Sequence, residues 1–327
     1  MVEFGYALSS EEHAPEDLVR NARRAEEVGF QFALISDHYH PWVSQQGHSP
    51  FVWGVIGAIG QATERLRLGT GVTCPTMRIH PAILAQAAAT AAAMMPGRFF
   101  FGVGSGEALN EHILGDHWPP ADIRLEMLEE AVEIIRELWK GEEVNYLGAY
   151  YTVENAQLYT LPEQLPPIYV AASGEKATTL AGEIGDGLIS TAPEEGLVEK
   201  FKEAGGEGKP CYGQVKVCWA ESKEEAEDIV YEIWPTGGIP GPLHADLPTP
   251  AHFEAAAKML SKEDVVKEVA CGPDKNVHLE QIQKMIEAGF DHIYIHQIGR
   301  EQEGFFRFYE REILPELEGM TKKTVAR

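Results

Sequence analysis

Short runs of hydrophobic residues alternate along the chain with segments in which hydrophobic positions recur every three or four residues. Residues 2–8 (VEFGYAL) and 32–36 (FALIS) are runs of the first kind. Between them, Leu18, Ala22 and Ala25 recur at the spacing that places side chains on one face of an α-helix. The pattern therefore predicts a buried strand, an amphipathic helix and a second buried strand.

The same alternation continues through the chain and predicts eight strands. Strands alternating with helices are typical of parallel βαβ units, and eight such units can close into a (β/α)8 TIM barrel. We expect one barrel domain over residues 1–327, with a doubly wound open sheet as the alternative. The further hydrophobic runs are residues 67–73, 98–104, 166–173, 187–191, 215–220 and 291–299.

Two segments interrupt this rhythm. Residues 143–166 are rich in tyrosine and threonine, and we expect a hairpin-like insertion there. Residues 235–262 are rich in proline and glycine and are too long for an ordinary connection between elements. We expect this second insertion to act as a lid or to shape a substrate site.

The charge of the chain narrows the classes of partner. With 27 basic and 51 acidic residues the formal net charge is -24, and a field of that sign repels nucleic acid and anionic membranes. No segment has the ~20 uncharged hydrophobic residues that a transmembrane helix needs. The four cysteines are scattered and form no CxxC pair, which argues against a zinc site and a disulfide framework. We expect a soluble, cytoplasmic protein that acts on a small molecule.

Polar or glycine-rich residues follow most of the predicted strands. In barrel enzymes the reactive groups lie on the loops at these carboxyl ends, whereas the opposite loops of this chain are plainer turns. The candidates are Asp37, His38 and Trp42 in SDHYHPW, then Thr70, Gly71 and Val72, then Glu107 and Asn110, then Ser173 and Gly174, and finally Thr191.

Simpler interpretations exist for several of these residues. The glycines of GVGSGE lack the later glycine and the acid of a dinucleotide-binding loop. Asp37, His38 and His40 contain metal-ligand types, but adjacent residues of an extended segment point to opposite faces. Glu107 could serve only to cap the helix that follows it. We therefore expect no bound metal. These interpretations do not explain why a His, a Trp and a Glu occur together at the same end of neighbouring strands.

Those three residue types suit the oxidation of an alcohol. A histidine can take a proton from a hydroxyl group near neutral pH. A buried glutamate can supply or accept a proton on the other side of a redox-active ring. Because no side chain accepts a hydride, a bound cofactor is required.

The segments SDHYHPW, QQGHSPF, LRLGTGVTCPTMRIHPA, RFFFGVGSGEALNE and YVAASGEKATTLAGEIGDG together resemble the F420-dependent glucose-6-phosphate dehydrogenase group of the bacterial-luciferase-like barrel superfamily. The similarity covers about residues 1–192 and is weaker through QIQKMIEAGFDHIYIH. It implies a hydroxyl substrate (a sugar, sugar phosphate or alcohol), the deazaflavin coenzyme F420 at the barrel mouth, and a homodimer. Two alternatives stay open, an FMN-dependent luciferase-like monooxygenase and a non-catalytic flavin-binding barrel.

The resemblance also implies roles for single residues. His38 matches the catalytic base, Trp42 the residue beside the reacting centre, and Glu107 the acid at the ring nitrogen. The family has a non-proline cis peptide bond where this chain has Gly71 and Val72. Positions that match contacts to the cofactor are Asp37, Gly71, Val72, Asn110, Ser173, Gly174 and Thr191.

One departure from the family bears on the substrate. Sugar-phosphate members place a basic residue on the loop after the Thr191 position, where this chain has Ala192-Pro193-Glu194-Glu195. Two carboxylates would repel a phosphate, so the sequence favours an uncharged hydroxyl compound. The lysines that could supply charge from elsewhere are Lys200, Lys202, Lys258 and Lys262, and we expect them to be solvated surface residues.

Overall fold

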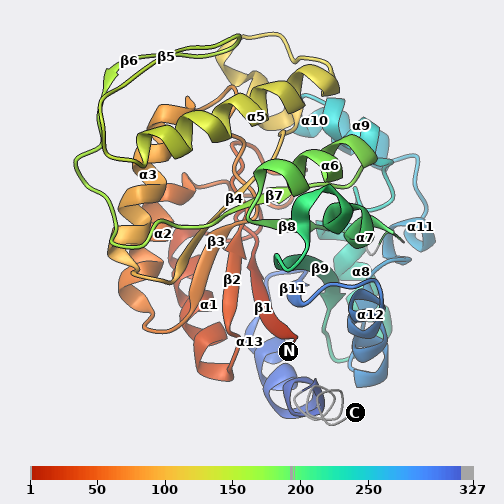
Figure 1. Cartoon of the computed structure of the whole chain (residues 1–327). Helices are drawn as coiled ribbons and strands as arrows, with labels where there is room; N and C mark the ends of the chain where they lie inside the picture. The colour runs from red at the N-terminus through yellow and green to blue at the C-terminus, as the bar shows by residue number, and fades with distance from the viewer. Residues whose placement is uncertain (1, 192–193, 195, 318–327) are drawn as a thin grey trace.

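The computed structural model describes residues 2–191, 194 and 196–317. Within these residues, eight parallel strands close into a barrel that helices surround (Figure 1). The predicted (β/α)8 barrel is confirmed, and the open sheet is excluded because the last strand pairs with the first. Around the barrel the strands are β1 (Glu3–Leu8), β2 (Phe32–Ile35), β3 (Arg67–Thr70), β4 (Phe99–Val103), β7 (Ile168–Ala171), β8 (Gly187–Ser190), β9 (Cys211–Cys218) and β11 (His292–Gln297).

Helices follow the strands and cover the outside of the barrel (Figure 1). Short elements also lie on the loops, and the two-residue strand β10 (Ala270–Cys271) adds to β9 outside the closed ring. The long helices are α1 (Pro15–Val28), α2 (Val52–Ala62), α3 (Pro81–Met94), α5 (Ala121–Leu138), α6 (Glu175–Ile184), α8 (Lys223–Ile233) and α12 (Lys275–Glu287). The short ones are α4 (Ala108–Glu111), η1 (His112–Leu114), α7 (Leu197–Phe201), η2 (Lys202–Gly206), α9 (Gly241–Asp246), α10 (Pro250–Ala257), α11 (Lys262–Val266), α13 (Glu303–Phe308) and η3 (Tyr309–Ile313).

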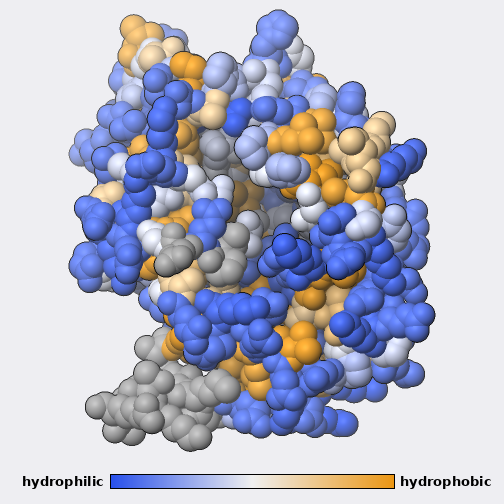
Figure 2. All heavy atoms as spheres, turned by 90° about the vertical axis from the view of Figure 1, so that its right-hand side faces the viewer, coloured by the Kyte–Doolittle hydropathy of each residue, from blue (hydrophilic) through white to orange (hydrophobic). Residues whose placement is uncertain are grey.

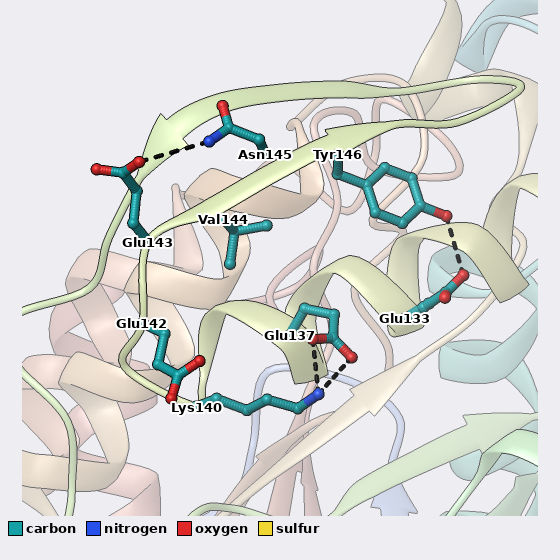
Figure 3. A pocket seen from close by; sticks show the side chains of 8 residues that line it. All are labelled: Glu133, Glu137, Lys140, Glu142, Glu143, Val144, Asn145 and Tyr146. Atoms are coloured by element: carbon teal, nitrogen blue, oxygen red, sulfur yellow. Dashed lines mark hydrogen bonds and ion pairs between the residues drawn. The ribbon is translucent and has the colours of Figure 1, made fainter.

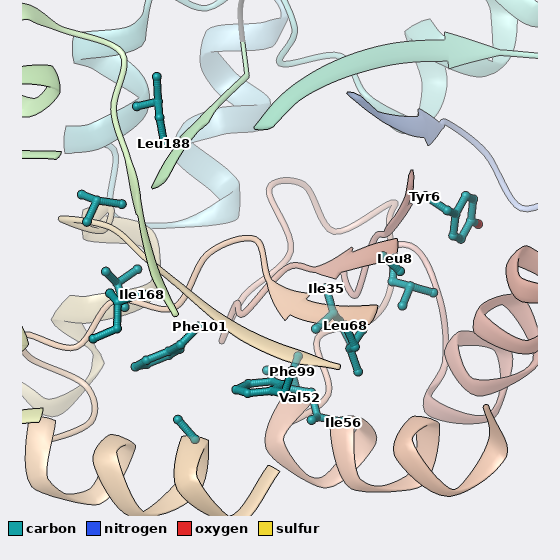
Figure 4. Packing of buried hydrophobic residues seen from close by; sticks show 14 of the residues in the cluster. Tyr6, Leu8, Ile35, Val52, Ile56, Leu68, Phe99, Phe101, Ile168 and Leu188 are labelled. Carbon is teal, nitrogen blue, oxygen red and sulfur yellow. The ribbon is translucent and has the colours of Figure 1, made fainter. Parts of the chain in front are cut away.

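Each barrel strand is buried on both faces, which explains its continuous hydrophobic run. In β2, Phe32 and Leu34 belong to the cluster inside the barrel, whereas Ala33 and Ile35 belong to the cluster between strands and helices. This alternation follows from the two-residue period of a strand. Figure 4 shows the outer cluster, in which strand residues such as Ile35 pack toward helical residues such as Ile56.

Helix α1 shows why the spacing of its hydrophobic residues predicted it. Leu18, Ala22 and Ala25 are fully buried, so the predicted face is the one that packs on the strands. The helix ends at Gly29, whose φ of 105° is in the left-handed region that glycine adopts without steric cost.

The two insertions take different forms. Strands β5 (Val144–Leu147) and β6 (Thr152–Ala156) form an antiparallel hairpin beside α5 (Figure 1). The segment 235–262 contains α9 and α10 and the start of α11. Its Phe253 is fully buried in a small hydrophobic cluster with Val43, on the loop after β2, and Leu109, on the short helix α4 that follows β4. This segment therefore packs over the carboxyl ends of the barrel strands.

Some predicted boundaries differ from the observed ones. Strand β3 ends at Thr70, three residues before the end of the predicted run. The Gly71–Val72 peptide bond just after it is cis, as the resemblance implied. Strand β9 begins at Cys211, four residues before the predicted run, because the polar residue Gln214 interrupts its hydrophobic pattern. Among the described helices, none is both long enough and hydrophobic enough to span a bilayer.

Candidate active site

His38 lies on the loop after β2, and two oxygen atoms of neighbouring residues lie near its Nδ1 atom. Nδ1 is 3.4 Å from Oε1 of Glu11 and 3.3 Å from the carbonyl oxygen of His40. Two acceptors at Nδ1 favour the tautomer that carries its proton there. The other ring nitrogen, Nε2, is then the unprotonated atom and can accept a proton.

Glu11 is held as a buried carboxylate. Its Oε2 accepts hydrogen bonds from the hydroxyls of Ser36 at 2.6 Å and Ser9 at 3.1 Å. Burial alone would raise the pKa of Glu11, but the charge of His38 and the hydrogen bond from Ser36 outweigh burial, and this pKa is lowered. Glu11 therefore stays ionised and keeps the imidazole oriented.

Trp42 joins the His38 loop to the 235–262 segment. Its ring centroid lies 4.9 Å from that of His38, 5.0 Å from that of His244 and 5.1 Å from that of Phe253. The last two residues belong to α9 and α10. The face of the molecule that carries α9 and α11 is hollowed and bordered by patches of hydrophobic side chains (Figure 2).

Glu107 occupies the N-cap position of α4, but its side chain makes no capping hydrogen bond. It is half-buried, and its charge acts on His244. Helix capping is therefore not what this side chain does, and the carboxylate is available for another partner at the barrel mouth.

Asn110 fastens the loop of His38 to α4. Its Oδ1 accepts hydrogen bonds from the backbone N–H groups of Tyr39 at 2.9 Å and His40 at 3.1 Å. Its Nδ2 is buried and meets no hydrogen-bond partner among the residues that the structure describes. Because a buried donor without a partner is costly, this atom points to a ligand that accepts its hydrogen bond.

A buried ionic cluster lies behind these loops. Arg78 donates to Oδ1 of Asp37 at 2.8 Å, and its backbone N–H donates to Glu111 at 2.8 Å. The hydroxyl of Thr73 donates to the other oxygen of Asp37 at 2.7 Å. The side chains of Arg78, Asp37 and Glu111 are 6%, 0% and 1% exposed. The carboxylate of Asp37 is therefore occupied within the protein, and its predicted contact with a cofactor stays a prediction.

One guanidinium in this cluster faces two carboxyl groups. Burial raises the pKa of Glu111 to about 7, and the charge of Arg78 offsets only part of that rise. Near neutral pH the cluster can therefore hold a proton on Glu111 while Arg78 balances Asp37.

The remaining predicted residues lie on the same rim. Gly71 and Val72 are half-buried, and Ser173 and Gly174 are exposed where α6 begins. Gly174 provides no side-chain cap, so the first N–H groups of α6 remain open to an anion. Thr191 is exposed after β8, and the predicted loop residues Ala192, Pro193 and Glu195 lie outside the described residues.

Sequence reasoning missed the residues that support His38. Glu11 and its neighbour Glu12 lie in SSEEH, the polar loop after β1. Because polar loops at the carboxyl ends of barrel strands carry the reactive groups, this loop could have been included among the candidates. Glu12 accepts hydrogen bonds from Nε2 of His296 at 2.9 Å and from the backbone N–H of Gly299 at 2.7 Å. Arg78 lies within the segment LRLGTGVTCPTMRIHPA, but no local sequence pattern indicated that it pairs with Asp37 and Glu111.

Other features of the surface do not lead to a second centre. Figure 3 shows a pocket between α5 and the hairpin, lined largely by carboxylates such as Glu133 and Glu137, which bond Tyr146 and Lys140. Among the described residues, no group of three or more His, Cys, Asp and Glu is arranged to hold a metal. Asp37, His38 and His40 take separate partners, Arg78, Glu11 and the carbonyl of Leu109.

Comparison with known proteins agrees with this geometry. Residues 1–292 match the luciferase-like monooxygenase family. The F420-dependent glucose-6-phosphate dehydrogenases of Microbacterium testaceum and Nocardia farcinica are 39% and 36% identical to the chain, which they match over 96% and 98% of its length and 97% and 99% of their own. An F420-dependent secondary alcohol dehydrogenase, solved with an F420-acetone adduct, superposes with a TM-score of 0.90 at 30% identity, covering 96% of this chain and 98% of that one.

Proposed function

The chain belongs to the luciferase-like monooxygenase family, and we propose that it is an F420-dependent dehydrogenase that oxidises a hydroxyl group to a carbonyl. The observation that carries this proposal is the orientation of His38. Its Nδ1 is engaged by Glu11 and by the carbonyl of His40, which leaves Nε2 as a base at the barrel mouth. An alcohol dehydrogenase needs such a base, because the hydroxyl proton must leave as the carbonyl forms.

The residues present fit a flavin-like cofactor with a phosphate. The unpartnered Nδ2 of Asn110 offers a hydrogen bond to a ring carbonyl, and the open N-terminus of α6 at Gly174 offers N–H groups to an anion. Val72, beside its cis peptide bond, presents a half-buried hydrophobic side chain to the same mouth. When bound there, F420 supplies the ring that accepts the substrate hydride.

The side chains of this protein then divide the remaining work. Nε2 of His38 takes the hydroxyl proton, and Glu11 stabilises the resulting imidazolium through Nδ1. Trp42, packed between His38 and the 235–262 segment, limits the space beside the reacting carbon and excludes water. Glu107, whose side chain makes no capping hydrogen bond, would be the carboxyl group that holds a proton for a cofactor ring bound at this mouth.

Equilibrium titration tests the cofactor assignment and separates it from the FMN alternative. The purified protein should bind F420 more tightly than FMN, and the Asn110→Leu variant should lose more affinity for F420 than the exposed control variant Asn145→Leu. Tighter binding of FMN than of F420 would assign the chain to the monooxygenase alternative.

We further propose that the enzyme works in the cytoplasm and as a homodimer. All four cysteines are free and buried, as suits a reducing compartment. Phe51, the residue before α2, and Ile83, on the neighbouring helix α3, are 64% and 58% exposed, and such residues suit a contact with a second copy. Light scattering of the eluting protein measures its mass and tests the dimer.

A further inference from the structure

The lysines that the sequence offered for a substrate phosphate are paired with carboxylates or exposed. Lys200 on α7 pairs with Glu175, and Lys262 on α11 pairs with Asp228 at 2.7 Å. Lys202 and Lys258 are exposed. The expectation that these four are surface residues agrees with their positions, and a cation for the substrate must come from another element.

Lys216 is a lysine inside the barrel. It lies on β9, four residues after Tyr212, whose ring belongs to the cluster in the barrel interior. Because side chains of a strand alternate, Tyr212 and Lys216 share the inward face. The residue opposite Lys216 on β11 is His296, which lies two residues after the inward-facing Tyr294.

The ammonium group of Lys216 meets no partner in the part of the chain that the structure describes. Among the described residues, no hydrogen bond or ion pair within 4.0 Å reaches it, whereas buried Arg78 has two carboxylates. Burial lowers the pKa of Lys216, and the charge of Glu268 offsets this only in part. The residue as a whole is half-buried, so part of it remains accessible. A cation in such a place is stabilised when an anion arrives.

Lys216 shares its surroundings with the proposed catalytic residues. The pKa of His244 is lowered mainly by burial and further by the charge of Lys216, whereas Glu107 acts on it in the opposite direction. His244 packs against Trp42, which packs against His38, at centroid distances of 5.0 Å and 4.9 Å. These contacts place Lys216 on the β9 side of the mouth, across from the base on the β2 side.

We propose that Lys216 binds an oxyanion, a phosphate or a carboxylate, of the hydroxyl substrate while the reacting carbon lies at His38. This inference rests on the proposed dehydrogenase function and names its specificity residue. From the sequence we expected an uncharged substrate because of the acidic residues after Thr191, and Lys216, within the run VKVCWA, was not considered.

Three sugars with the same anomeric hydroxyl test this specificity. Glucose, glucose 6-phosphate and glucuronate differ at C6, which carries a hydroxyl, a phosphate or a carboxylate. With F420 bound, kcat/KM should be about tenfold or more higher for one of the two anions than for glucose. The Lys216→Met variant should lose that advantage, so that its kcat/KM for the anion falls close to its own value for glucose. The exposed control Lys202→Met should behave as the wild type.

Ligand-induced thermal stabilisation gives a second readout that needs no turnover. The anion that Lys216 binds should raise the Tm of the F420 complex more than glucose does, and the Lys216→Met variant should lose this difference. Unchanged discrimination between anionic and neutral sugars in Lys216→Met would overturn the proposal, as would an equal loss for all three sugars. Absence of F420 reduction by every alcohol tested, with F420 bound, would instead count against the dehydrogenase function itself.

Discussion

Nδ1 of His38 lies 3.4 Å from a carboxylate oxygen of Glu11, a residue 27 positions earlier in the chain and almost fully buried. The pair joins the loops after β1 and β2 and turns the second ring nitrogen into the acceptor of a proton. His38 is thus held by the carboxylate of Glu11, which in turn accepts hydrogen bonds from serine hydroxyls. A carboxylate in this place fixes the tautomer of the catalytic histidine in other enzymes.

Replacing His38 by alanine should remove the base. General-base catalysis contributes ~10² to 10⁴-fold to rate, so we expect kcat to fall within that range while the Kd of F420 stays nearly unchanged. Steady-state kinetics and an F420 titration measure the two quantities. His117→Ala, at an exposed position outside the proposed site, is the matched control. Full activity of His38→Ala would remove this residue from the mechanism.

Replacing Glu11 by glutamine should weaken the base without removing it. Glutamine keeps the size of the side chain and can still accept from Ser36, but it no longer carries the charge that stabilises the imidazolium. We expect a lower kcat with little change in the Kd of F420, and a smaller loss than in His38→Ala. Glu16→Gln, exposed on α1, serves as control. A Glu11→Gln variant as active as the wild type would show that orientation by this carboxylate is dispensable.

Arg78 should be important for folding. Removing one partner of a buried ion pair leaves an uncompensated charge and typically costs about 3 to 5 kcal/mol. We expect Arg78→Met to lower the free energy of unfolding in urea by this order, because Asp37 loses its cation. Arg20→Met breaks only an exposed pair with Asp17 and should change little. Equal stability of the two variants would contradict the assignment.

The pKa of Glu111 predicts how stability changes with pH. The unfolded chain loses this proton near 4.5, whereas the folded protein keeps it to about 7. Between these values the unfolded state binds fewer protons, so Glu111 lowers the free energy of unfolding as the pH rises. Relative to Glu111→Gln, the wild type should lose on the order of 3 kcal/mol between pH 4.5 and 7 and then level off.

Urea denaturation of both proteins across this pH range measures the difference. The same comparison for Glu129→Gln, an exposed residue of α5, should be nearly independent of pH. A difference for Glu111→Gln that grows in favour of the wild type as the pH rises would reverse the sign and show that Arg78 dominates over burial.

The barrel could be predicted from the sequence because its strands are buried on both faces. Phe32, Ala33, Leu34 and Ile35 are all buried, two of them toward each side, and this makes a continuous hydrophobic run between amphipathic helices. The rim loops could be located because residues that follow consecutive strands meet at one end. His38, Trp42 and Glu107 were predicted as site residues in this way.

The supporting contacts could not be predicted, because they join residues that no local pattern connects. Arg78 and Asp37 are 41 positions apart, and Glu12 and His296 are 284 apart. A single sequence shows that each residue is charged or polar but not which charge it meets. Lys216 left only a weak signal, a charged residue at an inward position of a hydrophobic run, and its meaning depends on which face of β9 points into the barrel.

The most direct test of the central claim is the absorbance of oxidised F420, followed without oxygen in the presence of the enzyme and a panel of hydroxyl substrates. The account predicts that the absorbance falls with at least one alcohol or sugar, that the corresponding carbonyl compound forms in equal amount, and that His38→Ala abolishes most of this change although it still binds F420. F420 that binds but is not reduced by any hydroxyl compound, together with oxygen-dependent turnover of bound FMN, would contradict it.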